Sequence, residues 1–119
     1  MRDVLGAACS GLCLIHCALL PVLAATGTSF IGFAILSSES MHLWLSVAML
    51  LIALWAFPSG WRVHKRLLPG LLAIAAAVLM LFALFASEAS GVYWVVASCL
   101  AIIGAHLMNR HLLSARANG

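Results

Sequence analysis

Long apolar runs separated by short polar stretches make up most of this chain. A membrane helix needs about 20 mainly apolar residues to cross a hydrocarbon core of about 30 Å. The polar breaks divide the chain into four apolar stretches close to that length, which predicts four transmembrane helices. These helices are expected over about residues 5–25, 41–57, 71–86 and 92–111. Residues 30–36, "FIGFAIL", are too short to span, and we expect them at the membrane interface.

The basic residues all lie in alternate segments between the apolar runs. They precede the first run, separate the second from the third, and follow the fourth: Arg2, Arg62, Lys65, Arg66, Arg110 and Arg116. The other two connections carry Glu39 and Glu88 and no Lys or Arg. Basic segments face the cytoplasm by the positive-inside rule. The sequence therefore predicts an all-α integral membrane protein, an antiparallel bundle of four transmembrane helices with both the N and the C terminus cytoplasmic.

The composition supports a membrane protein and argues against several function classes. Hydrophobic residues make up 66% of the chain and charged residues 8%, whereas about a quarter of a soluble domain is charged. No basic cluster with interleaved aromatics occurs, so we expect no nucleic acid partner. The three acids are dispersed, and no paired carboxylates, serine elbow or phosphate loop is present, so we expect no enzyme.

The first apolar run contains an unusual concentration of soft metal ligands, "CSGLCLIHC", at residues 9–17. A helix turns about 100° per residue, so Cys9, Cys13, His16 and Cys17 fall within an arc of about 100° on one face. Thiolates and imidazoles are the ligands that soft metals prefer. The spacing therefore predicts a metal site formed by these four side chains. Packing is the alternative, because cysteine is also a small, commonly buried hydrophobe.

The fourth run offers a second pair of candidate ligands, Cys99 and His106. They lie seven residues apart and therefore share a helix face. At 1.5 Å per residue their depths match those of the first-run ligands. Packing of Cys99 and carbonyl capping by His106 are the alternatives. His42 and His64 are interpreted as interfacial residues.

Four short pieces occur in order along the chain: "CLIHCALLP", "SSESMHLW", "GWRVHKR" and "AHLMNRHL". In this order and placement they resemble the MerC family of small four-span membrane proteins, which is associated with mercury(II) uptake. The resemblance covers roughly residues 5–112. It implies a single MerC-like domain over residues 1–119, multi-pass in the inner membrane. It further implies transport of a soft metal ion across the cytoplasmic membrane, with the first-span cysteines receiving the ion.

The ligand set departs from the family pattern in two ways. A histidine stands between the thiols Cys13 and Cys17, and the tail "LLSARANG" lacks the cysteine pair that mercury-resistance members carry there. A mixed Cys/His set also suits Cu(I) or Zn(II), so these ions are alternatives to Hg(II).

We interpret the ligand set as a route for ligand exchange in which the metal ion is cargo and no cofactor is permanently bound. Cys17 or Cys13 would receive the ion, and Cys9 would release it inward. The outer side has no cysteine, so a periplasmic metal donor would deliver the ion. Small residues on the opposite face of this helix allow a homodimer within the lipid bilayer: Ala7, Gly11, Ala18 and Ala25.

Two hypotheses of other classes stay open. In the first, the chain is a redox protein, with His16 and His106 as axial ligands of a b-type haem held in the bundle. In the second, it is a structural or regulatory membrane subunit whose cysteines only pack.

Overall fold

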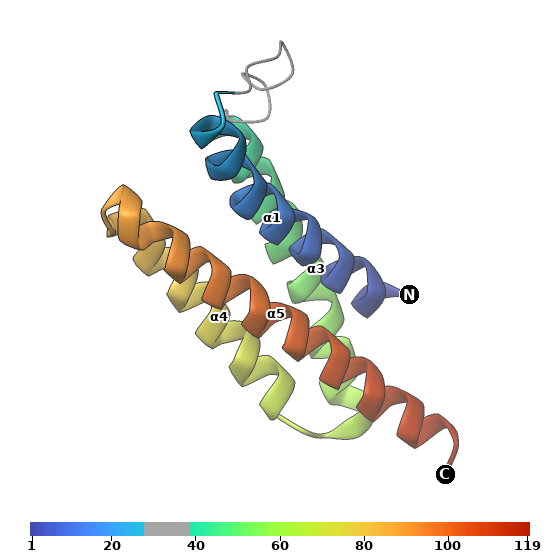
Figure 1. Cartoon of the computed structure of the whole chain (residues 1–119). Helices are drawn as coiled ribbons and strands as arrows, with labels where there is room; N and C mark the ends of the chain where they lie inside the picture. Colours follow the sequence, from blue (N-terminus) through green and yellow to red (C-terminus); the bar gives the residue numbers. More distant parts are fainter. Residues whose placement is uncertain (28–38) are drawn as a thin grey trace.

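The computed structural model describes residues 1–27 and 39–119, and this part of the chain is all helical, as the sequence predicts. The helices are α1 (Arg2–Ala25), α3 (Glu39–His64), α4 (Leu68–Phe85) and α5 (Glu88–Ala117), shown in Figure 1. The interfacial stretch expected at 30–36 lies outside the described residues. Three helices of the described part are long and apolar enough to cross a membrane, over Leu43–His64, Leu68–Phe85 and Ser90–Ala117.

The expected end of the second apolar stretch at Phe57 is wrong, because α3 continues through Pro58 to His64. Proline removes one backbone donor from a helix but does not have to end it. The hydroxyl of Ser59 donates to the carbonyl oxygens of Trp55 and Ala56, at 2.9 and 2.8 Å. The helix ends instead where Lys65 adopts a φ of 58°, the left-handed conformation typical of a helix C-cap.

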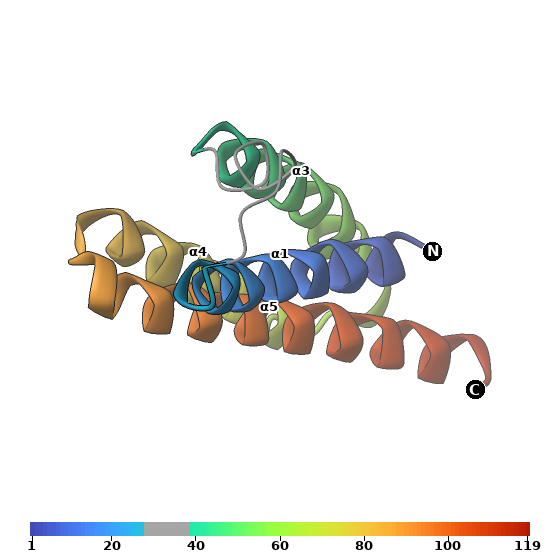
Figure 2. The ribbon, with the colours of Figure 1, turned by 45° about the horizontal axis from the view of Figure 1, so that its top comes forward.

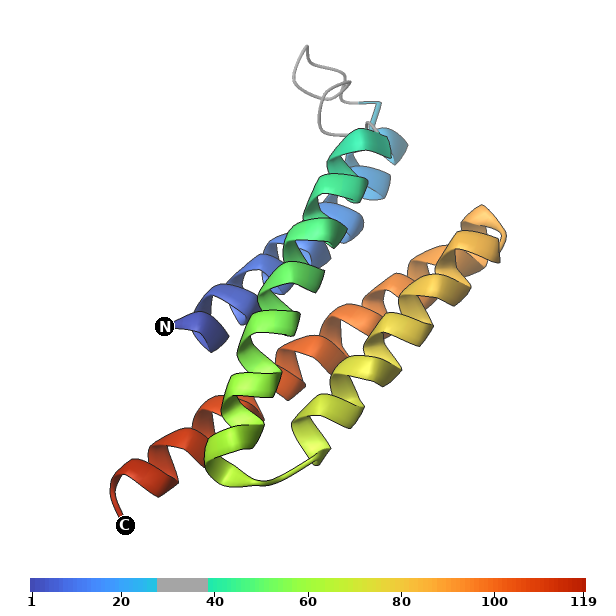
Figure 3. The same cartoon turned by 180° about the vertical axis from the view of Figure 1, so that it is seen from behind.

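α4 and α5 form a closely packed hairpin, and α1 and α3 form a more loosely packed pair. α4 packs along α5, while α1 packs against both α5 and α3. The hydroxyl of Ser98 on α5 donates to the carbonyl of Ala76 on α4 at 2.7 Å, which ties the hairpin together. α3 has little contact with α4, and the two helices diverge toward one end (Figures 2 and 3). The helices therefore form an open bundle with α5 in contact with each of the others.

Two glycines make room for polar side chains of α5. A Cβ atom on Gly6 of α1 would collide with the imidazole of His106, and one on Gly60 of α3 would collide with the amide of Asn109. Phe57 covers the His106 ring, with ring centroids 4.7 Å apart and an interplanar angle of 28°. Small residues let membrane helices approach closely. Here Gly6 of α1 and Gly60 of α3 also leave space for His106 and Asn109 of α5.

The large apolar side chains mostly point outward. Leucine, isoleucine, valine, phenylalanine and tryptophan side chains are exposed along all four described helices. The apolar core is small and consists of Phe57, Ala76, Ile102 and Ala105. An apolar surface this extensive would aggregate in water, whereas a bilayer solvates it. The distribution of side chains agrees with the membrane-spanning lengths of the helices.

The glycine contacts predict different outcomes for two alanine substitutions in α1. Gly6→Ala forces a methyl group into the His106 ring and should destabilise the protein by about 1–3 kcal/mol, as overpacking usually does. Gly11→Ala is the matched control, because a Cβ there meets nothing within 4 Å. Thermal unfolding in detergent measures both variants. Equal melting temperatures would contradict the close packing of α1 on α5.

Candidate functional site: a buried thiol cluster beside a polar network

A buried row of residues runs along one face of α1. It consists of residues spaced alternately three and four apart, Asp3, Gly6, Ser10, Cys13 and Cys17. Side chains at these intervals lie above one another on a helix. The Ser10 hydroxyl, which is fully buried, donates to the carbonyl of Gly6 at 2.8 Å. The row thus turns the polar and thiol face of α1 into the protein, while the leucines beside it face outward.

The two cysteines of this row contact a third cysteine, which lies on another helix. Cys13 and Cys17 of α1 form a buried cluster with Cys99 of α5, whose side chain is 0% exposed. The Sγ atoms of Cys13 and Cys17 lie 4.0 Å apart, and Cys99 contacts Cys13. Apolar side chains surround the cluster, Leu14, Met49 and Val95. The structure thus brings Cys99, from the last helix, to two of the first-helix cysteines.

The spacing of Cys13 and Cys17 suits two ligands on one ion. A metal–sulfur bond of about 2.3 Å puts two sulfurs about 3.8 Å apart at a tetrahedral angle and about 4.6 Å apart in a line. The observed 4.0 Å falls within this range. Among the residues that the structure describes, no group of three or more Cys, His, Asp or Glu side chains is arranged to hold a metal ion. The distance between the two sulfurs is therefore compatible with one ion bound by both of them.

The structure places Cys9 and His16 differently from the buried thiols. Cys9 is partly exposed, one helical turn nearer the N-terminus than Cys13, and lies outside the buried cluster. His16 is partly buried on α1 next to Cys17 in sequence, and its Nε2 atom is buried. The four side chains expected to form one site are therefore divided, with two in the thiol cluster and two at its margins.

His106 belongs to a separate polar network and not to the thiol cluster. Its Nδ1 atom lies 3.1 Å from Oδ1 of Asp3, which also accepts a hydrogen bond from Nδ2 of Asn109 at 2.9 Å. Oδ1 of Asn109 lies 2.8 Å from Nε2 of His64. All four side chains are buried, and they join α1, α3 and α5 near the N-terminus of α1. His64, expected at the membrane interface, is the last residue of α3, and its side chain is buried against Asn109.

The hydrogen bonds fix the protons of this network. The backbone N–H of Arg66 donates to Nδ1 of His64 at 3.0 Å, so that atom carries no proton. Nε2 of His64 then carries the proton and donates to Oδ1 of Asn109. This orients the Asn109 amide so that its N–H donates to Asp3, and the carboxylate accepts from His106 as well. Each polar group in the chain from Arg66 to Asp3 has a matching partner, as a buried network requires.

Sequence reasoning missed Asp3, His64 and Asn109 as members of one site. Asp3 resembles a terminal surface acid, and His64 lies in a basic segment. Asn109 gave the available signal, because a polar side chain within an apolar helix needs a partner inside the protein. Its neighbours in space come from two distant segments, which single-helix periodicity does not identify.

Comparison with known proteins gives one match. The family model described as "MerC mercury resistance protein" matches residues 3–111, which is most of the chain. No curated protein and no solved structure matches significantly.

The burial of the cysteines predicts the order in which they react with a thiol reagent. One of the four, Cys9, should label first, since Cys13, Cys17 and Cys99 are buried and reagents need access to the sulfur. Mass spectrometry after brief maleimide treatment should count one label per chain, and Cys9→Ser should abolish it. Denatured protein, in which all four cysteines react, is the control. Early labelling of Cys99 would contradict the thiol cluster.

Proposed function

Since the chain belongs to the MerC family of mercury resistance proteins, we propose that it transports a soft metal ion across the cytoplasmic membrane, with Hg(II) as the foremost cargo. The observation that carries the proposal is the meeting of Cys13, Cys17 and Cys99 inside the bundle. A buried set of thiols contributed by two helices provides neighbouring ligands between which an ion can move. The ion is cargo, and the transport involves no permanently bound cofactor.

The proposal includes α1 as a fourth membrane span, so that the protein is multi-pass in the inner membrane. α1 packs along α5 and α3, both of spanning length, over a helix of 24 residues. Arg2, the α3–α4 connection and the C-terminal part of α5 carry the basic residues, while Glu39 and Glu88 begin α3 and α5 at the other ends. This charge asymmetry supports the proposal that both termini lie in the cytoplasm.

Charge neutralisation is the physical reason for using thiols. A bare divalent ion is prohibitively costly to place in a low-dielectric interior. Two thiolates cancel its charge, so the complex with Cys13 and Cys17 is neutral. Each thiol that bonds to the ion passes its proton to the ligand that departs, so the exchange breaks one metal–ligand bond for each one formed. No net charge is created within the membrane.

The order of the thiols along α1 defines a route. Cys17 and Cys13 receive the ion, Cys99 offers a third sulfur beside them, and Cys9 releases the ion toward the N-terminal end of the helix. Successive positions four residues apart differ by about 6 Å in height, about one helical turn. Exchange between adjacent sulfurs requires an incoming ligand close to the bound ion, which this spacing supplies.

The donor set favours Hg(II) over the other ions. Zn(II) in proteins is usually held by four ligands, whereas the described residues gather thiols without a nearby closed set of imidazoles or carboxylates. Cu(I) also accepts thiolates and is the nearer competitor. The haem alternative has little support, because Nε2 of His106 packs at Gly6 of α1 and Phe57 covers the face of the ring.

Two partners complete the proposal. A periplasmic metal donor delivers the ion, because the outer side offers no thiol ahead of Cys17. A second copy of the chain packs on the small-residue face of α1, where a Cβ on Gly11 would meet nothing within 4 Å. The lipid bilayer surrounds the remaining helix faces.

Serine substitutions separate binding of the ion from its release. Loss of a side chain that only hydrogen-bonds to a metal ligand weakens metal binding roughly 10–100-fold. Cys13→Ser/Cys17→Ser removes both thiolate ligands, so it should weaken Hg(II) binding by more than that. Uptake into proteoliposomes should then be lost. Cys9→Ser is the matched control: it should keep the affinity of the cluster and slow uptake only. Competition among Hg(II), Cu(I) and Zn(II) for reduced protein measures the affinities.

Two results would contradict the proposal. Unchanged uptake in the double variant, with its melting temperature preserved, would assign the cysteines to packing. Tighter binding of Zn(II) or Cu(I) than of Hg(II) would reassign the cargo.

A further inference from the structure

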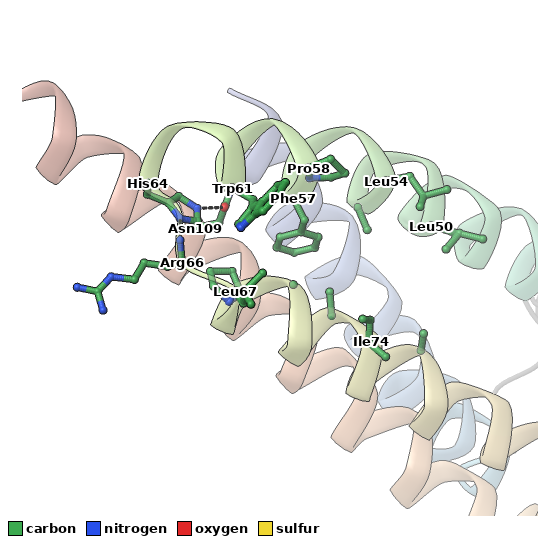
Figure 4. Close-up of a pocket in the computed structure, with 15 residues that line it drawn as sticks. Leu50, Leu54, Phe57, Pro58, Trp61, His64, Arg66, Leu67, Ile74 and Asn109 are labelled. Carbon is green, nitrogen blue, oxygen red and sulfur yellow. Dashed lines mark hydrogen bonds between the residues drawn. The ribbon is translucent and has the colours of Figure 1, made fainter.

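A groove opens between α3 and α4, the two neighbouring helices with the fewest contacts. Its cavity measures about 380 Å³ and is lined mainly by apolar side chains, including Leu50, Leu54, Phe57 and Ile74 (Figure 4). A second cavity of about 240 Å³ shares Leu50, Ala53, Ala73 and Ala77 with the first. The two cavities therefore form one elongated apolar groove along the helices.

One end of the groove is positively charged. Arg66 is the only permanently charged residue among the described residues that line the larger cavity, and Figure 4 shows its guanidinium directed away from the apolar part. Arg62 lies in the last turn of α3 and Lys65 directly follows that helix, and both side chains are exposed. The groove is thus apolar along most of its length and cationic at one end, which we call its mouth.

The polar network holds this mouth in place. The backbone N–H of Arg66 donates to His64, which in turn is hydrogen-bonded to Asn109, at 3.0 and 2.8 Å. His64 and Asn109 also line the groove, but they satisfy each other. The arginine is therefore anchored by a buried network through its backbone, while its side chain stays exposed.

No acid compensates the charge at this mouth. Asp3 lies beside Arg2 near the N-terminus, but its carboxylate is buried and accepts hydrogen bonds from Asn109 and His106. The other acids, Glu39 and Glu88, begin α3 and α5 at the opposite end. Lys65 lies over the ring of Trp61, which lines the groove, at 5.6 Å. Tryptophan and lysine at a helix end are typical of the membrane interface.

We propose that this groove binds one anionic phospholipid from the leaflet at the basic end of the bundle. An acyl chain lies along the apolar walls between α3 and α4, and the phosphate lies at Arg66, with Arg62 and Lys65 beside it. Basic residues at the end of an apolar groove between membrane helices attract anionic headgroups. The lipid fills the space where α3 and α4 do not touch. The proposal does not depend on metal transport.

Lipid binding to delipidated protein in detergent tests the proposal. Native mass spectrometry and melting temperature would compare phosphatidylglycerol with phosphatidylcholine of the same acyl chains. We expect one phosphatidylglycerol to bind preferentially and to raise the melting temperature. Arg66→Gln should weaken its binding by about fivefold, the effect of one interfacial cation. Arg116→Gln, the same change at an exposed site near the end of α5, should leave it unaltered.

A variant that fills the groove tests whether the acyl chain binds there. Ala77 is exposed and lines both cavities. Ala77→Phe should therefore weaken the binding of both lipids, while the new ring stays outside the protein core. Equal binding of the two lipids by the unmodified protein would overturn the proposal. So would equal effects of the two arginine variants, or unchanged binding in Ala77→Phe.

Discussion

The contact between α1 and α5 is the interaction on which the rest of the structure depends. Within a membrane, polar groups must find partners inside the protein, because lipid offers none. α1 turns its buried row, which includes Asp3, Ser10, Cys13 and Cys17, toward its neighbours. His106 and Asn109 of α5 supply partners at one end, and Cys99 supplies a third thiol further along. The same contact therefore stabilises the bundle and assembles the thiols.

The two halves of this contact have different chemical characters. The network of Asp3, His106, Asn109 and His64 is satisfied by its own hydrogen bonds and fixes three helices together. The thiols contact one another, with Cys13 beside both Cys17 and Cys99, and apolar side chains pack around them. In the proposed transport, the hydrogen-bonded network would hold the helices together while the ion passes between the sulfurs. The groove between α3 and α4 is lined in part by Met49, which also packs against the thiol cluster.

Local patterns in the sequence predicted those features that depend on a single helix. Spacing along the chain predicted the all-helical fold and a shared face for Cys13 and Cys17, but not which helix covers that face. The contact of Cys99 with Cys13 required knowledge of how α1 and α5 pack. His106 was expected as a ligand because it shares a helix face with Cys99, and that spacing does not reveal its contact with Asp3, 103 residues away in the sequence. The end of α3 was predicted too early, because the helix continues beyond Pro58, where the Ser59 hydroxyl donates to the carbonyls of Trp55 and Ala56.

X-ray absorption at the mercury edge tests the central claim most directly, because it counts the sulfur atoms bound to the ion. Full-length reduced protein with one equivalent of Hg(II) should show an ion bound by sulfur at about 2.3 Å, with at least two sulfurs from the cluster. The Cys13→Ser/Cys17→Ser variant should lose that shell. A spectrum with oxygen or nitrogen ligands in place of sulfur, or one unchanged in the double variant, would contradict the assignment of the buried thiols as the metal site.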